Sequence, residues 1–202
     1  MALKESPTPM RQAVDLPKAY RLLNHGPTVL VSAAHAGQRN VMAAAWAMPL
    51  DFDPPKVVVV IDKSTFTRGL VEASGHFVLN VPCRDFADAS FTVGSVSGGD
   101  MGDNDKFERY GLGSFAGSVV GAPLLEGCVA WLECRLLPEP HNQQRYDLFI
   151  GEVLAASADD RVFSNGRWHF SAEHDGLRTI HHVAGGAFLI AGDTVQAQVL
   201  PG

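Results

Sequence analysis

Residues 57–71, VVVVIDKSTFTRGLV, decide the fold, because an apolar run of β-branched side chains ends abruptly in polar ones. Four valines and an isoleucine predict a strand buried on both faces, since β-branched side chains are stiff and fit a pleated surface. The next residues predict a helix start capped by Ser64 or Thr65. Hydroxyls, Lys63 and the free N–H groups of that helix start would together favour a bound anion.

The bulk composition limits the class of protein. The chain has 202 residues, 46% hydrophobic and 19% charged, which predicts one globular domain over residues 1–202, with residues 1–15 and 195–202 as peripheral arms. The formal charge of −6 comes without a Lys/Arg cluster, so we expect neither nucleic acid nor a membrane as a partner. No apolar run could span a bilayer and no secretory signal opens the chain, which predicts a cytoplasmic protein.

Three cysteines, Cys83, Cys128 and Cys134, form an odd set without a C-x-x-C pair. This number and spacing favour reduced, buried thiols over a disulfide framework. Cys134 lies in the alternating segment VAWLECRL, so we interpret it as a small core-facing residue of a strand. A nucleophilic role would need a lowered thiol pKa.

Short strand-like segments recur along the chain after an amphipathic stretch near residues 17–23. They are TVLVSAA (28–34), NVMAAAWAMPL (40–50), the valine run, HFVLNVP (76–82), VAWLECRLLPE (129–139) and YDLFIGEVLAAS (146–157). A turn at residues 35–38 predicts a hairpin, Gly75 predicts the end of the first helix, and residues 84–95 are helical in pattern. A polar loop at residues 140–145 predicts that its two flanking strands are antiparallel. Many strands with few brief helices favour an antiparallel barrel decorated by helices.

The side chains of residues 40–48 divide by parity between the two faces of a strand. Met42, Ala44, Trp46 and Met48 share one face, and Val41, Ala43, Ala45 and Ala47 share the other. The second face is nearly bare, so a planar heterocycle could approach the main chain there; the alternative is that the alanines pack against a helix. A ligand with a flat ring and a phosphate would fit this strand together with the polar turn that follows it.

These segments carry a family resemblance. The succession GPTVLVSA, NVMAAAWAMPLDFDPP, VVVVIDKSTFTRGLVEASGHFVLNVP, DKFERYGL and FIGEV resembles the flavin reductase-like, FMN-binding split-barrel family, in particular its flavoredoxin-like members. The resemblance runs in order from about residue 17 to about residue 189. It implies a mainly β fold with short helices, a six-stranded antiparallel split β-barrel of the FMN-binding type. It also implies a homodimer with FMN at or near the subunit interface.

The same resemblance implies a set of FMN contacts. It places Asn40, Met42, Ala43, Ala44, Ala45 and Trp46 along the ring and ribityl chain, Asp62, Lys63, Ser64, Thr65 and Thr67 around the phosphate, Asn80 and Val81 on the next strand, and Ser97, Gly98, Lys106 and Phe107 near the cofactor. Many relatives have Thr or Ser where the three alanines stand, and often a His near Tyr146 and Asp147. Without these hydroxyls the ring depends more on main-chain contacts. The missing histidine argues against a proton shuttle near Tyr146 and Asp147.

The resemblance implies an oxidoreductase in which FMN takes a hydride from NADH or NADPH and electrons pass to free flavin or to a partner protein. No catalytic side chain is expected, because the cofactor carries this chemistry. One alternative is an FMN-holding electron carrier without its own NAD(P)H turnover, as in flavoredoxins. Another is a barrel that has lost its flavin. The sequence leaves the nicotinamide, the electron acceptor and the choice between FMN and FAD open, whereas a phosphate-binding turn favours FMN over riboflavin.

Two other clusters suggest metals only superficially. His169, His174, His181 and His182 lie close in sequence, but the adjacent pair points to opposite faces of a strand, so we expect no metal site. One of that pair could reach a nicotinamide pocket; the alternative is a solvated or core histidine. Asp100, Asp103 and Asp105 alternate as in a calcium loop, but Gly111 stands where the loop needs Glu. Asp103 or Asp105 is instead expected to cap a helix over residues 106–110.

Overall fold

A long strand that breaks in the middle closes the sheet into a barrel. The computed structural model describes residues 26–102 and 105–200. In it β1 (Val29–His35) and β2 (Gln38–Ala44) form the predicted hairpin, with Ala36 and Gly37 at positive φ in the turn. The chain then breaks its pairing, and β3 (Ala47–Phe52) pairs with β4 (Pro55–Val60). The prediction of one continuous strand over residues 40–50 is therefore wrong, because its two halves pair with different neighbours.

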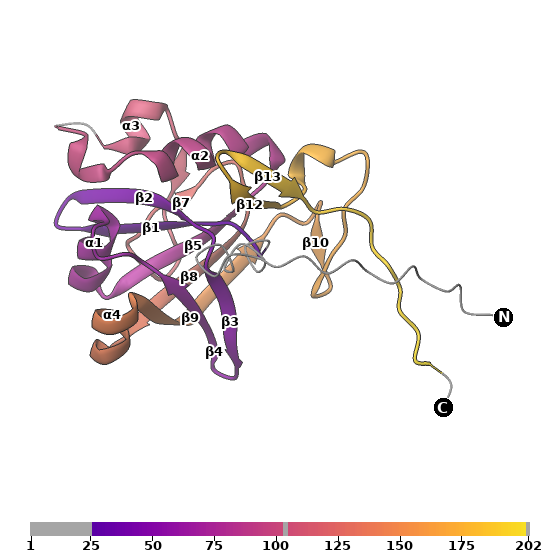
Figure 1. The fold of residues 1–202 in the computed structure, drawn as a ribbon, viewed down its shortest axis with the longest axis horizontal. Coiled ribbons are helices and arrows are strands. Elements are labelled where there is room, and N and C mark those ends of the chain that lie inside the picture. Colours follow the sequence, from indigo (N-terminus) through magenta and orange to yellow (C-terminus); the bar gives the residue numbers. More distant parts are fainter. Residues whose placement is uncertain (1–25, 103–104, 201–202) are drawn as a thin grey trace, which may run out of the picture.

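The other strands complete the ring. β5 (His76–Pro82) pairs with β1 and with β8 (Cys128–Leu137), and β9 (Leu148–Ala158) pairs with β8 and β4, all antiparallel. The order is β2-β1-β5-β8-β9-β4-β3. Since β2 and β3 are consecutive halves of one broken strand, this order returns to its start as a six-stranded split barrel (Figure 1). The predicted fold class is confirmed.

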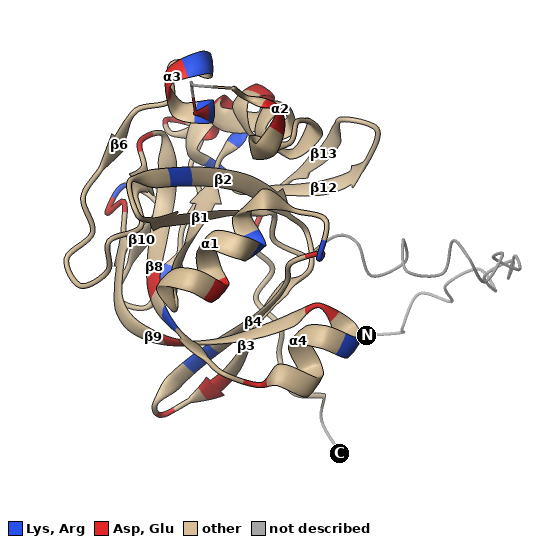
Figure 2. Ribbon diagram, turned by 90° about the vertical axis from the view of Figure 1, so that its left-hand side faces the viewer, with Lys and Arg blue, Asp and Glu red and all other residues tan. Residues whose placement is uncertain are grey.

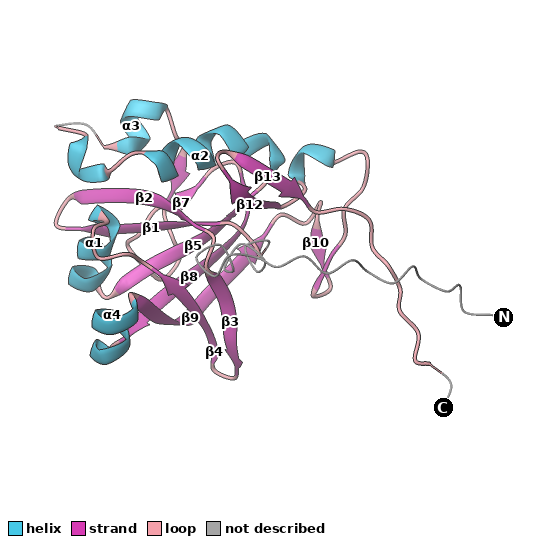
Figure 3. Cartoon of the chain, in the orientation of Figure 1, coloured by secondary structure: helices cyan, strands magenta, loops and turns pink. Residues whose placement is uncertain are grey.

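Helices cover the barrel at two places (Figure 3). α1 (Phe66–Ser74) follows β4 and ends at Gly75 in the left-handed conformation, as predicted. The helical pattern after β5 forms the 3-10 turn η2 (Arg84–Phe86) and α2 (Ala87–Ser95). η3 (Gly98–Asp100) and α3 (Lys106–Tyr110) follow, and α2 and α3 lie together above β2 in Figure 1.

The segment over residues 140–145 is a helix and not the predicted loop. α4 (Pro140–Tyr146) begins with Pro at its first turn, where a missing N–H costs nothing, and ends at Asp147 with a φ of 54°. Only Gln143 is buried in it. The helix therefore lacks the apolar stripe by which a sequence pattern reveals one.

Three small hairpins extend the barrel. They are β6 (Ser114–Phe115) with β7 (Leu124–Leu125), β10 (Phe163–Ser164) with β11 (Arg167–Trp168), and β12 (Ile180–Ala184) with β13 (Ala187–Ile190). The 3-10 turn η4 (Asp175–Leu177) precedes β12. Hydrogen bonds join the last hairpin to the chain just before β1: Thr28 N–H donates to Ile180 O, and His182 N–H donates to the Thr28 hydroxyl. This places β12 and β13 beside α2 (Figure 1).

The main core fills the barrel around Phe77 and Phe149, and a second cluster lies between the β1–β2 hairpin and α2 and α3. All three cysteines are buried and free, as predicted. Burial raises the pKa of the Cys134 thiol to about 12, which keeps it protonated and unreactive.

Acidic and basic residues alternate with uncharged ones along the ribbon in Figure 2. Among the described residues, no helix combines the length and apolarity that crossing a bilayer requires. Residues 195–200 form neither helix nor strand. The predicted N-terminal arm and the amphipathic stretch near residues 17–23 lie outside the described residues.

Candidate functional site

Ala43, Ala44 and Ala45 form the shared wall of two adjoining cavities. We name these three residues the alanine floor. The smaller cavity, of about 210 Å³, lies between the floor, α2 and the β12–β13 hairpin. The larger, of about 460 Å³, runs from the floor past Trp46 to Asp62. Because they share the floor and His182, they form one groove, called the alanine groove below, whose size is typical of sites for small ligands, roughly 300–1,000 Å³.

The predicted bare face of β2 is only partly open. Val41 is fully buried, and α2 packs so closely that a Cβ added at Gly94 would lie 2.9 Å from the Ala43 Cβ. The alternative of alanine packing against a helix is therefore correct at Ala43, because glycine and alanine allow close approach there. The groove opens at Ala45, where the strand breaks before β3, whereas Ala44 is only 8% exposed and belongs to the barrel core.

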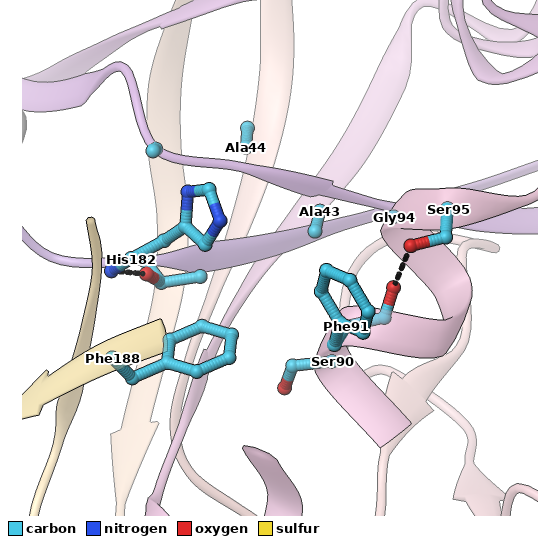
Figure 4. Close-up of a pocket in the computed structure, with 10 residues that line it drawn as sticks. Ala43, Ala44, Ser90, Phe91, Gly94, Ser95, His182 and Phe188 are labelled. Carbon is cyan, nitrogen blue, oxygen red and sulfur yellow. Dashed lines mark hydrogen bonds between the residues drawn. The ribbon is translucent and has the colours of Figure 1, made fainter. Parts of the chain in front are cut away.

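Aromatic rings surround the smaller cavity. Figure 4 shows the rings of His182, Phe91 and Phe188 around it, with Ala43 and Ala44 along one side. Phe91 comes from α2, and His182 and Phe188 come from the β12–β13 hairpin, where their rings lie 5.3 Å apart in an edge-on arrangement. Sequence reasoning did not assign the two phenylalanines, and it left the role of His182 open. The signal that could have found them is the histidine pair followed by a tight Gly185–Gly186 turn.

The two neighbouring histidines face opposite ways, as predicted. His182 lines the alanine groove, whereas His181 lines a separate apolar cavity of about 480 Å³ with Met48 and Trp168. The Nδ1 atom of His181 is buried without a hydrogen-bond partner. The described residues include no group of three His, Cys, Asp or Glu side chains placed to hold a metal ion.

The predicted anion site lies at the far end of the groove. Asp62 lines the groove, and its Oδ1 accepts hydrogen bonds from the Ser64 hydroxyl at 2.6 Å and the Ser64 N–H at 2.8 Å. The hydroxyl bond from Ser64 and then its backbone bond lower the pKa of Asp62. The Thr65 hydroxyl donates to Asp62 O at 2.8 Å. We call residues 62–65 the Asp62 corner. Its donors are turned inward, so a bound anion would have to replace the Asp62 carboxylate at Ser64.

Asn40 and Thr67 join the strand of the floor to the helix of the corner. Both are buried, and Asn40 Nδ2 donates to Thr67 Oγ1 across 2.8 Å. Gly98 packs against the same amide, since a Cβ there would lie 2.5 Å from Asn40 Oδ1. The Ser97 hydroxyl accepts from Gly99 N–H. These predicted contacts are therefore brought together beside the groove, where they support it and do not line it.

A buried arginine holds α1, the helix that follows the Asp62 corner, against the end of α4. Arg68, in α1, donates to Asp147 Oδ1 at 2.5 Å and to Gln143 O at 2.8 Å. It also pairs with Glu72 one turn along the helix. Asp147 and Gln143 therefore hold the arginine in place.

Four predicted cofactor contacts lie away from the groove. Asn80 is fully buried; its amide donates to Leu30 O and Ser32 Oγ, and its carbonyl accepts from Leu125 N–H. Val81 packs against a third group of core residues. The Asn80 side chain points inward and makes its hydrogen bonds within the protein, whereas Val81, the next residue of β5, faces the opposite side of the sheet.

Phe107 and Lys106 are also buried, between β2 and α2. Phe107 is 2% exposed and lies under the Arg39 guanidinium, 4.6 Å from its carbon. Lys106 is 1% exposed, and its Nζ donates to the carbonyls of Val41 and Val93 at 2.8 and 2.7 Å. Burial lowers the pKa of Lys106 to about 8. Asp105 accepts from Glu108 N–H and caps α3, which confirms one of the two predicted caps; Asp103 lies outside the described residues.

The groove fits a flat cofactor with an anionic tail. Its floor carries only methyl groups, and β2 pairs along one edge only, with β1, so main-chain groups of its other edge lie outside the sheet ladder. Asp62 lines the far end, and the hydroxyls of Ser64 and Thr65, exposed Lys63 and the first turn of α1 follow directly after it in the chain. This donor set suits a phosphate, whereas the floor suits a planar ring.

Comparison with known proteins identifies relatives of this chain. The family model for the flavin reductase like domain matches residues 21–175. The crystal structure of an FMN-binding domain of a flavin reductases-like enzyme from Shewanella baltica is 49% identical, with a TM-score of 0.82, and the match covers 93% of this chain and 97% of that one. The uncharacterized protein YddH of Escherichia coli is 48% identical over 91% of this chain and 96% of its own length. An FMN reductase (NADH), RutF, of Stutzerimonas stutzeri is 24% identical over 70% of this chain and 78% of its own length.

Proposed function

This chain belongs to the flavin reductase-like domain family, and we propose that it binds FMN in the alanine groove and acts as an oxidoreductase of the flavin reductase type. The observation that carries the proposal is the continuity between a methyl-lined floor and a hydroxyl-rich helix start, joined by the Asn40–Thr67 hydrogen bond. A ring and a phosphate separated by a flexible chain need these two environments in one groove.

The residues that would hold FMN follow from this geometry. Met42, Trp46 and the alanine floor would flank the ring, and main-chain groups there would fix its edge. The Asp62 corner, with Lys63 and the N–H groups that open α1, would bind the phosphate once Ser64 turns its donors away from Asp62. Asn40 and Thr67 would hold these two parts in register.

When bound, FMN supplies the redox chemistry, accepting a hydride and passing on electrons. The hydride donor we propose is NADH or NADPH, which is supported by the NADH-dependent RutF relatives. The smaller cavity would take the nicotinamide ring, because Phe91 and Phe188 offer apolar faces beside the same floor. His182 would contact that ring from β12. The acceptor we propose is free flavin or a partner protein, the assembly a homodimer and the location cytoplasmic.

The proposal is tested with purified protein. Titration with FMN, followed by absorbance and flavin fluorescence, is expected to show saturable binding of one FMN per chain. NADH or NADPH oxidation in the presence of free FMN then measures turnover. Turnover supports the reductase, whereas a yellow protein reduced only by a redox partner supports an electron carrier. A protein that stays colourless after FMN is added contradicts the proposal.

A further inference from the structure

Lys106 carries its ammonium into the protein interior, where the described part of the chain provides it with no acidic partner. The side chain is 1% exposed, and both hydrogen bonds of its Nζ go to neutral carbonyls. The neighbouring carboxylate, Asp105, pairs with Arg39 instead. Nowhere in residues 26–102 and 105–200 does a salt bridge include Lys106. Burying a charge without a counter-charge is costly, and a methionine would fill the same space without that cost.

The two carbonyls belong to the two walls of the alanine groove. Val41 lies on β2, two residues before Ala43 of the floor, and Val93 lies on α2, directly before Gly94. Gly94 and Ala43 mark the closest approach of the helix to the strand. One ammonium therefore ties α2 to β2 beside the point where the groove opens, on the side of β2 that the helix covers.

We propose that Lys106 is a positioning residue that clamps β2 to α2 and places a fixed positive charge behind the alanine floor, where it favours the electron-rich, reduced state of a flavin in the groove. This inference rests on the proposed function. A positive charge in a poorly screened interior stabilises negative charge that develops nearby, and two carbonyls only partly offset it. Because Lys106 does not line the groove, it acts through β2 and its field, not by contact with the ligand.

Two substitutions separate the clamp from the charge. Lys106→Gln keeps N–H donors that can reach a carbonyl but removes the charge, and Lys106→Met removes both. Lys56→Met is the matched control, because Lys56 lies on β4 in an exposed pair with Asp51. The midpoint potential of FMN bound to each full-length protein is measured by equilibration with a reference dye, together with the dissociation constant for oxidised FMN and the unfolding midpoint.

We expect Lys106→Gln to bind oxidised FMN with nearly wild-type affinity but to lose about tenfold of its preference for reduced over oxidised FMN, a shift of about 30 mV to more negative potential for a two-electron couple. Lys106→Met should show the same shift together with weaker binding. A Lys106→Gln protein that binds FMN with an unchanged potential would overturn the inference and leave the proposed function standing. A wild-type protein that fails to bind FMN would overturn both.

Discussion

Asn40 Nδ2 donates a 2.8 Å hydrogen bond to Thr67 Oγ1, and both residues are buried. This one contact joins the strand that carries the alanine floor to the first turn of the helix that follows the Asp62 corner. The two halves of the groove are 27 residues apart along the chain at this pair. Their register is therefore set by a buried side-chain contact in addition to the barrel.

Thr67→Val is expected to reduce the free energy of unfolding by about 1–3 kcal/mol, because it leaves the buried Asn40 amide without its acceptor. FMN affinity should fall as well, since the corner is no longer held against β2. Denaturant unfolding and FMN titration measure the two effects. In the double variant with Asn40→Ala the two losses should be less than additive, because both substitutions remove the same bond. Full additivity would show that the two residues are not coupled.

Arg68→Met is expected to reduce the free energy of unfolding by about 3 kcal/mol, because it strands the Asp147 carboxylate in a largely buried site. The matched control is Arg135→Met, which removes an exposed pair with Glu152 and should cost less than about 1 kcal/mol. Urea unfolding compares the two. Equal losses would mean that Arg68 contributes no more than an ordinary surface arginine.

The buried ammonium of Lys106 predicts a specific pH dependence. Its pKa is lowered from 10.5 to about 8 in the folded protein. Between these values the unfolded chain binds more protons than the folded one, so the unfolding free energy contributed by this group rises with pH, by up to about 1 kcal/mol per pH unit. Below pH 8 both states are protonated and the contribution is constant.

The difference in unfolding free energy between the wild type and Lys106→Met isolates the contribution of the Lys106 ammonium, because the buried thiols of Cys128 and Cys134 titrate in both proteins. The free energy of unfolding, measured at several pH values from 7 to 10, should rise with pH more steeply for the wild type than for the variant above pH 8. Parallel curves over that range would mean that the ammonium is not held in an unfavourable environment.

The sequence predicted those parts of the fold that depend on local chemistry. The valine run, the turn at Ala36 and Gly37 and the glycine cap at Gly75 each follow from neighbouring residues, and all are confirmed. The break between β2 and β3 depends on which distant strands pair with each half, which no local pattern contains. α4 was missed because a polar helix with one buried residue has no apolar stripe.

The features of the site also divide into those that local sequence predicts and those that depend on distant partners. Strand alternation identified the small face with Ala43 and Ala45 and the opposite orientations of His181 and His182, because both follow from a period of two. The same period places Ala44 on the other face, and Ala44 belongs to the barrel core. Burial of Asn80 and Lys106 depends on partners at Leu30, Leu125 and Val93, which are distant in sequence. A sequence does not distinguish polar residues that form hydrogen bonds within the interior from polar residues that face a ligand.

The most direct test of the account is FMN titration of the wild type beside Ala45→Leu, with Ala156→Leu, an exposed alanine of β9, as the control. Leucine at position 45 fills the groove at the floor, where its extra volume would clash with a bound ring. A steric cost of about 1–3 kcal/mol corresponds to a loss of affinity of roughly tenfold or more. We predict that the wild type and Ala156→Leu bind FMN alike and that Ala45→Leu binds it at least tenfold more weakly while unfolding at a similar denaturant concentration. Equal FMN affinity in all three folded proteins would contradict the claim that the alanine groove holds the flavin.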